Sequence, residues 1–246
     1  MKKHFPRLHR FLRTLFPKRT KELPPLPENP VVKENRFVLR KADGTEINHP
    51  QIDGLKVTFL GKNNIVELYE PLPRFINCNI ALRDEATFIM HESTPQHVVR
   101  DMTVWKMRRR SKIEIGKFFT CVGVGFAMHC EDDLHVTIGD DCMFSHDVHI
   151  QPSDSHSIID LDTKKALNFG KDIVIGNHVW IAPDAFILKG SVIPDNCVIG
   201  AISVVSKPLF ESNAVYVGNP VRMIRKNITW DRSSAQDYER RMSRGC

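Results

Sequence analysis

The sequence predicts an all-β fold in which short strands coil into a three-sided parallel β-helix, because aliphatic residues recur at every sixth position within residues 113–221. Neither the 3.6-residue period of a helix nor the two-residue alternation of an ordinary strand produces this repeat. A small or aliphatic residue also stands four positions after each lead residue. The leads of six consecutive hexads are Ile175, Ile181, Ile187, Ile193, Ile199 and Val205.

A repeat of six has a direct structural meaning. One short strand and its turn take about six residues, so three of them close one triangular coil of about eighteen residues. The lead residue of each hexad points into the prism and stacks on its equivalents in neighbouring coils, which gives a core of aliphatic columns. The residues four positions after the leads are Val179, Ala185, Ser191, Cys197, Ser203 and Leu209.

The repeat weakens towards the N-terminus. Ile138, Phe144 and Ile150 still lead clear hexads, with Cys142 and Val148 four positions after the first two. Weaker echoes are Ile115 with Phe119, Cys121 with Gly125, and then Ile76, Leu82 and Phe88. This loss of regularity predicts irregular coils in the N-terminal part of the β-helix.

Four segments follow from these patterns. The first joins a basic stretch, residues 1–22, whose apolar residues fit an amphipathic helix, to a proline-rich linker. Such an arm either lies on an anionic membrane face or packs against its own subunit. The segments are 1–30 (arm and linker), 31–112 (irregular coils), 113–226 (hexapeptide-repeat β-helix) and 227–246 (charged tail with helical spacing).

Composition narrows the possible classes of function. A net charge of +6 suits an anionic partner such as a phosphate-bearing cofactor, a nucleic acid or an acidic membrane. No nucleic-acid recognition motif is present, so we expect no nucleic-acid partner. The six cysteines form no CxxC pair, which indicates reduced thiols rather than a zinc ribbon or a dithiol site. No apolar window is long enough for a membrane span or a secretory signal, so we expect a cytoplasmic protein.

Three sequence motifs carry a family resemblance. HVWIA at 178–182, VIGAISVVSK at 198–207 and GNPVRMIRK at 218–226 resemble the hexapeptide-repeat acetyltransferases, most closely the maltose, galactoside and capsular-polysaccharide O-acetyltransferases. The resemblance covers residues 55–226 and is strongest after 136. It implies a left-handed coil, which is an exception to the usual right-handed crossover. It also implies homotrimers with active sites between adjacent subunits.

The hexad phase breaks at residues 157–172, an excursion from the coil directly after His156. By resemblance, His156 is the catalytic base and Trp180, 24 residues further on, lies beside the cofactor thiol. An imidazole is well matched to deprotonating a hydroxyl at neutral pH. Asp154 either orients His156, contacts the acceptor or only caps backbone amides. The donor to the oxyanion is a backbone amide or the Trp180 indole, and the sequence does not choose between them.

The resemblance also implies acetyl-coenzyme A as co-substrate. Small residues leave room for its pantetheine arm, and arginines suit its phosphates because the guanidinium donates two hydrogen bonds at once. We expect no metal, because His146 and His149 fall on different parts of a strand and turn. The cofactor-binding residues implied are Trp180, Ala182, Ala201, Ser206, Lys207, Arg222 and Arg225.

The predicted function is therefore acetyl transfer to a hydroxyl of a glycan, either a capsular or other surface polysaccharide or its precursor. The first alternative is an acetyltransferase of a small free sugar or antibiotic. The second, from another class, is a non-catalytic β-helix that serves as a binding or scaffold protein. A serine acetyltransferase is disfavoured because its long helical N-terminal domain is not evident. The basic arm, residues 1–22, would provide peripheral contact at the inner membrane face.

Overall fold

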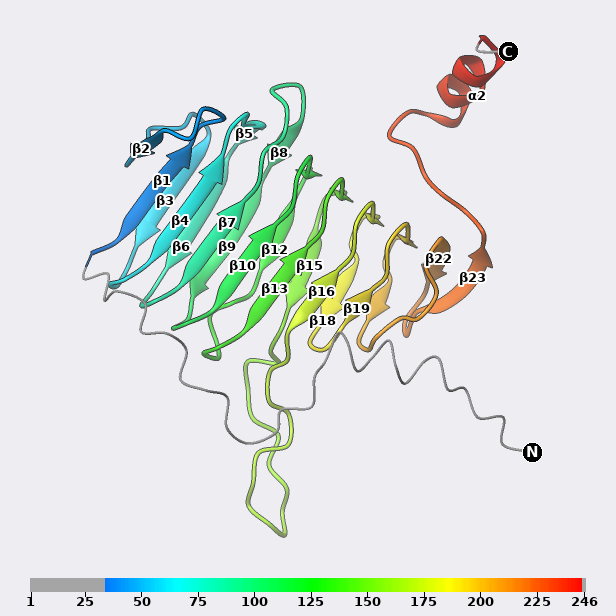
Figure 1. Ribbon diagram of the computed structural model, residues 1–246. Coiled ribbons are helices and arrows are strands. Elements are labelled where there is room, and N and C mark those ends of the chain that lie inside the picture. Colours follow the sequence, from blue (N-terminus) through cyan, green and yellow to red (C-terminus); the bar gives the residue numbers. More distant parts are fainter. Residues whose placement is uncertain (1–33, 245–246) are drawn as a thin grey trace. The chain divides into compact units, whose positions relative to one another are not determined.

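The computed structural model describes residues 34–244, and the predicted arm and most of the linker lie outside these residues. The described chain forms a stack of triangular coils whose three sides build three largely parallel sheets (Figure 1). We call the sheets face 1, face 2 and face 3, in the order in which the chain crosses them within one coil. Corners 1–2, 2–3 and 3–1 are the turns between faces.

Every complete coil contributes one strand to each face, and strands in adjacent coils pair in parallel. Face 1 contains β1 (Arg36–Arg40), β2 (Glu46–Asn48), β4 (Ile65–Tyr69), β7 (Thr87–Met90), β10 (Lys112–Ile115), β13 (His135–Ile138), β16 (Ile173–Ile175) and β19 (Val192–Ile193). Face 2 contains β5 (Arg74–Ile76), β8 (Val98–Arg100), β11 (Thr120–Cys121), β14 (Met143–Phe144), β17 (Trp180–Ile181), β20 (Val198–Ile199), β22 (Ala214–Val217) and β23 (Arg222–Lys226). Face 3 contains β3 (Leu55–Phe59), β6 (Cys78–Leu82), β9 (Met102–Met107), β12 (Val124–Phe126), β15 (Val148–Gln151), β18 (Phe186–Leu188) and β21 (Val204–Val205).

The core consists of the predicted stacked columns. All six lead residues from Ile175 to Val205 are at most 1% exposed, and the six residues four positions after them are also buried. The polar member Ser191 is accommodated because its hydroxyl donates to the carbonyls of Leu188 (2.6 Å) and Val205 (3.0 Å). One column on face 2, joined by strand pairing throughout, is Phe75, Val99, Cys121, Phe144, Ile181 and Ile199.

Coil length explains why the repeat fades upstream. Adjacent coils are 18 residues apart where Trp180 pairs with Val198, but 23 where Thr120 pairs with Met143. The intervals upstream of the excursion are therefore not multiples of six, and the phase drifts. Two predicted core positions are wrong for this reason. Phe75 rather than Ile76 faces the core, and Val124 replaces Gly125 because the turn after Cys121 is one residue shorter.

Corner 1–2 is reinforced by a ladder of side-chain to backbone hydrogen bonds. The carboxylate of Asp195 accepts from the Asn177 amide (2.7 Å), and the side-chain oxygen of Asn177 accepts from the Asp140 amide (2.8 Å). Asp140 in turn accepts from the Lys117 amide (2.8 Å). Each bond joins one coil to the next, so the turns at this corner are held in register.

Antiparallel strands lie at both ends of the stack, since β2 pairs with β1 and β23 pairs with β22. Beyond β23 the tail forms α2 (Ala235–Arg244), which confirms the predicted C-terminal helix. The Ser234 hydroxyl caps this helix by accepting from the Asp237 amide (3.2 Å). No residue of α2 is buried. Within residues 34–244, no helix has the length and apolar character that a membrane crossing requires.

Candidate active site

The excursion leaves the stack at corner 3–1, between β15 and β16, and projects from the column (Figure 1). His149 pairs with Phe186 at an interval of 37 residues, against 18 for the next coil, so the excursion adds a full coil length without adding a coil. A single bridge between Ile159 and Ala166 closes it as a hairpin. Its exposed large apolar side chains are Ile158, Ile159, Leu161, Leu167 and Phe169.

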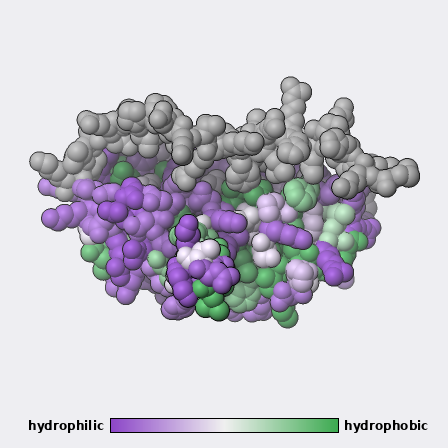
Figure 2. Space-filling view, turned by 90° about the horizontal axis from the view of Figure 1, so that it is seen from below, coloured by the Kyte–Doolittle hydropathy of each residue, from purple (hydrophilic) through white to green (hydrophobic). Residues whose placement is uncertain are grey.

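The view from below has the excursion pointing at the reader and shows apolar and polar residues mixed on this side (Figure 2). The base of the excursion is fixed to the preceding coil through Glu131. Its carboxylate accepts hydrogen bonds from the Ser153 hydroxyl and from the Gly170 amide (2.9 Å). Both ends of the excursion are therefore anchored, whereas its apolar side chains remain open to solvent.

His156 lies at the base of the excursion and is exposed. Its backbone is fixed: the amide donates to the Asp154 carbonyl (2.8 Å), and the carbonyl accepts from Nδ2 of Asn168 (2.8 Å). The imidazole makes no hydrogen bond to any residue between 34 and 244, so both ring nitrogens are accessible. A fixed backbone with a free ring is the arrangement that a general base acting on an external hydroxyl requires.

Asp154 does not contact the imidazole. Its carboxylate accepts hydrogen bonds from Nζ of Lys189 and from Nδ2 of Asn168 (2.8 Å). The Lys189 hydrogen bond, followed by that of Asn168, holds the pKa of Asp154 below its usual range. Because Asn168 also binds the His156 carbonyl, Asp154 supports the loop that carries the base rather than the base itself. Asn168 and Lys189 were not expected from the sequence, since they lie 14 and 35 residues from Asp154.

Trp180 occupies a different side of the prism. It stands in β17 on face 2, is half-buried, and its indole N–H donates to the Ser145 hydroxyl at 3.4 Å. Face 2 is the side of the triangle opposite corner 3–1, where the excursion begins. The core therefore separates His156 from Trp180 within one chain.

The other predicted cofactor residues divide between two corners. Ala182 and Ala201 follow β17 and β20 at corner 2–3, where the Ile202 amide donates to the Pro183 carbonyl (2.9 Å) and stacks the two turns. Ser206 and Lys207 follow β21 and lie at corner 3–1, the corner of the excursion. The structure thus groups Trp180 with the two alanines, and His156 with Ser206 and Lys207.

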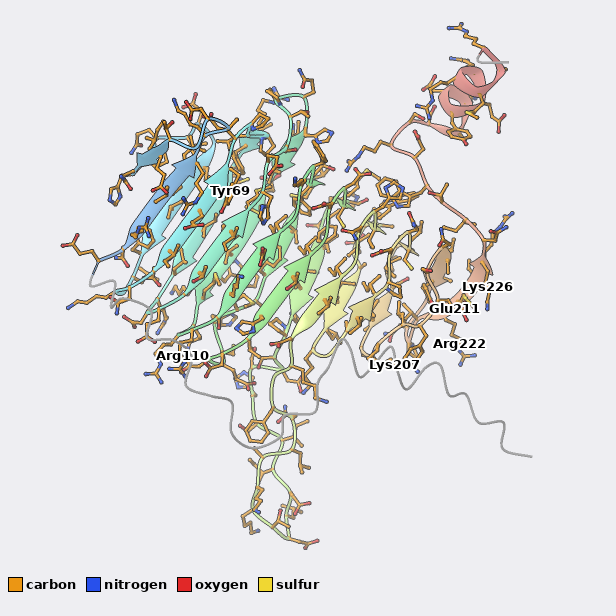
Figure 3. All side chains as sticks on the ribbon, viewed as in Figure 1. Tyr69, Arg110, Lys207, Glu211, Arg222 and Lys226 are labelled. Carbon is orange, nitrogen blue, oxygen red and sulfur yellow. The ribbon has the colours of Figure 1, made fainter. Side chains whose placement is uncertain are left out.

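Basic side chains gather at the C-terminal end of the stack. Arg222 and Arg225 stand in β23, whose residues are all exposed, and Figure 3 shows Lys207 and Arg222 at this end. Lys226 pairs with Glu211 (3.3 Å). Within residues 34–244, neither arginine nor Lys207 forms an ion pair. Their charges remain available to an anionic ligand such as a phosphate.

Two other residue groups can be compared with the expectations. His149 stacks on Phe186 with ring centroids 4.4 Å apart, whereas His146 lies in an exposed group with Asp147 and Asp184 whose polar atoms are within 4.8 Å of one another. The two histidines therefore do not converge.

The described cysteines are all free, as expected. Burial raises the pKa of Cys142 to about 12 and that of Cys197 to about 11, so these thiols are not thiolate nucleophiles near neutral pH.

A three-sided coil stack built from hexads is the fold of the hexapeptide-repeat acetyltransferases, and comparison with known proteins confirms this resemblance and its left-handed coil. The chain is 41% identical over 123 residues to polysialic acid O-acetyltransferase of Escherichia coli O1:K1, a match that covers 50% of this chain. It is 36% identical over 116 residues, or 47% of this chain, to galactoside O-acetyltransferase of E. coli K12.

Among solved structures, the polySia-specific acetyltransferase NeuO aligns over 86% of this chain and 93% of its own, with a TM-score of 0.61 and 28% identity. The matched region spans 39% of the polysialic acid enzyme and 55% of the galactoside enzyme, and thus about half of each curated relative or less. No family model matches the chain.

Proposed function

We propose that the chain is an acetyl-coenzyme A-dependent O-acetyltransferase that acts on a hydroxyl of a capsular or other surface polysaccharide, or of its precursor. The proposal is carried by one observation: an exposed, unbonded imidazole stands on a fixed backbone at the only long break in a hexapeptide-repeat coil within residues 34–244. The similarity to polysialic acid O-acetyltransferase supports a polysaccharide acceptor.

In the proposed reaction, the imidazole of His156 accepts the proton of the acceptor hydroxyl as its oxygen attacks the acetyl carbonyl. The thioester supplies an activated acetyl group. The imidazolium then returns its proton to the departing thiolate, so the histidine ends each cycle unchanged. Negative charge that develops on the carbonyl oxygen requires a donor, and the long hydrogen bond from Trp180 to Ser145 leaves the indole N–H free to serve.

The division of the residues between two sides of the prism supports a site formed between two subunits. One subunit would supply His156, Ser206 and Lys207 from corner 3–1, and its neighbour Trp180 with the alanines of corner 2–3. We therefore propose a homotrimer, as the resemblance implies. The apolar side chains exposed on the excursion are suited to contact a neighbouring subunit, because a monomer leaves them in water.

The residues available also suit coenzyme A. Ala182 and Ala201 stack at one corner without long side chains that would block an extended arm. Arg222, Arg225 and Lys207 provide positive charge at the C-terminal end of the same stack, where the phosphates would bind. Peripheral membrane contact through residues 1–22 of a cytoplasmic protein remains part of the proposal, on the sequence alone. Deleting this arm and fractionating membranes tests it.

The decisive experiment follows thiol release from acetyl-coenzyme A across a panel of polysaccharides, free sugars and antibiotics. We expect an acidic or neutral surface polysaccharide to stimulate release, with the new ester identified by mass spectrometry. Stimulation by small sugars or antibiotics alone would favour the alternative enzyme. If no acceptor raises release above the rate of His156→Ala, the chain is a non-catalytic β-helix.

A further inference from the structure

The tail between β23 and α2 contains a short segment, residues 229–232, that lies along corner 1–2; we call it the C-terminal strap. Trp230 of the strap contacts the coil that carries β17, and Arg232 contacts the coils that carry β14 and β11. A tail with no structural role would be exposed along its length, yet Trp230 is only 8% exposed. The strap is therefore a packed part of the coil stack.

Trp230 is held by His178 in two ways. Its indole N–H donates to the His178 carbonyl (2.7 Å), and its ring stacks on the imidazole with centroids 4.2 Å apart and an interplanar angle of 10°. Nε2 of His178 in turn faces the Trp230 carbonyl at 3.0 Å. The two residues thus fix each other through backbone and side chain.

Arg232 closes this contact network. Its guanidinium donates to one oxygen of Asp141 (2.8 and 3.1 Å) and lies over the Trp230 ring, 5.6 Å from the centroid. The other oxygen of Asp141 lies 2.7 Å from Nδ1 of His178. Arg232 also donates to the Thr120 hydroxyl (2.6 Å). The network couples the strap to the turn that leads into β17.

This turn determines where Trp180 lies. His178 has a φ of 52°, in the left-handed region that non-glycine residues seldom adopt, and Trp180 follows two residues later. The Trp180 ring packs directly against Trp230, with centroids 6.3 Å apart at 49°, within the range of favourable aromatic pairs. The strap thus supports both the backbone that leads to Trp180 and one side of its indole.

We infer that the C-terminal strap is a positioning element of the acyl-transfer site, in which Trp230 fixes the orientation of the Trp180 indole. The inference rests on the proposed function, because that function places Trp180 beside the thioester. Without Trp230 the indole gains rotational freedom that cofactor binding must remove again. The expected consequence is weaker binding of coenzyme A, with the proton transfer at His156 unaffected.

The test compares Trp230→Ala and Trp230→Phe with the matched control Trp105→Ala, which removes an exposed tryptophan from face 3. We expect Trp230→Ala to raise the KM for acetyl-coenzyme A about three- to tenfold, the effect of one aromatic pair, while kcat changes less than about twofold. Trp230→Phe keeps the stacked ring but loses the N–H donor, so its KM should lie in between. The control should match the wild type.

A second readout does not depend on turnover. Tryptophans 180 and 230 should form a coupled pair whose exciton signal in circular dichroism disappears in Trp230→Phe but persists in Trp105→Phe. Coenzyme A binding is then titrated by fluorescence quenching in the Trp105→Phe background. If Trp230→Ala does not fold, Trp230→Phe decides the outcome.

An unchanged KM and an unchanged dissociation constant in a folded Trp230 variant overturn the inference. A wild-type protein that binds coenzyme A but acetylates no acceptor removes the proposed function, while the binding titration still tests the strap. A wild-type protein that does not bind coenzyme A overturns both.

Discussion

An imidazole that deprotonates an alcohol needs access to the alcohol and a fixed point of attachment. His156 has both, because its ring is exposed while its amide and carbonyl are bound by Asp154 and Asn168. Its catalytic role was expected from the break in the repeat, which sequence alone reveals. The supporting contacts were not, because Asn168 and Lys189 reach Asp154 only after the excursion has folded back.

Replacing His156 by alanine therefore removes a proton acceptor without removing a structural contact. We expect kcat to fall by about 10²- to 10⁴-fold, the usual range for general-base catalysis, with the KM for acetyl-coenzyme A nearly unchanged. Steady-state kinetics with the best acceptor measures this. His135→Ala, an exposed histidine in β13 on face 1, is the matched control. Turnover within threefold of the wild type in His156→Ala would show that another group takes the proton.

At the level of elements, the hexad phase predicted the strands downstream of the excursion because every coil there has the same length. It failed at Ile76 and Gly125, where coil intervals that are not multiples of six move the inward position by one residue. The strap was also missed. Charge spacing indicates the helix, but the burial of Trp230 depends on a partner 52 residues away that no local pattern reveals.

The excursion depends on one ion pair at its base, and this pair sets its pH dependence. Lys189, with Asn168, lowers the pKa of Asp154, so the contact is present above the ordinary carboxyl pKa and is lost as the pH falls through the lower folded value. We expect hydrogen exchange of residues 157–172, corrected for intrinsic rates, to be constant from about pH 8 to 5 and to accelerate in stronger acid, below about pH 4.

The variant Lys189→Met removes the pair at every pH. Its excursion should exchange faster already at neutral pH, and its kcat should fall because His156 is carried on a looser loop. Lys165→Met changes a lysine on the excursion that forms no ion pair within residues 34–244 and serves as the control. Equal exchange in Lys189→Met and the wild type would assign the anchoring to Glu131 alone.

At the scale of the whole molecule, the triangular coil keeps the proposed base and the proposed thioester neighbour on opposite sides of one core. A parallel β-helix is stiff along its stacked columns, so no local rearrangement brings corner 3–1 to face 2. A working site then requires a second copy that lays its face 2 against the excursion of the first. The proposed trimer supplies three such junctions, and each uses residues of two chains.

This geometry predicts complementation between two inactive variants. His156→Ala keeps an intact Trp180, and Trp180→Ala keeps an intact His156, so a mixed trimer contains junctions that combine the two intact residues. If subunits mix at random at equal amounts, about one quarter of the junctions are intact, and about that fraction of wild-type activity should return after joint refolding. Mixing the folded trimers without exchange should restore nothing. Activity that stays at the level of the separate variants after proven exchange would place both residues in one subunit's site and remove the shared-site argument.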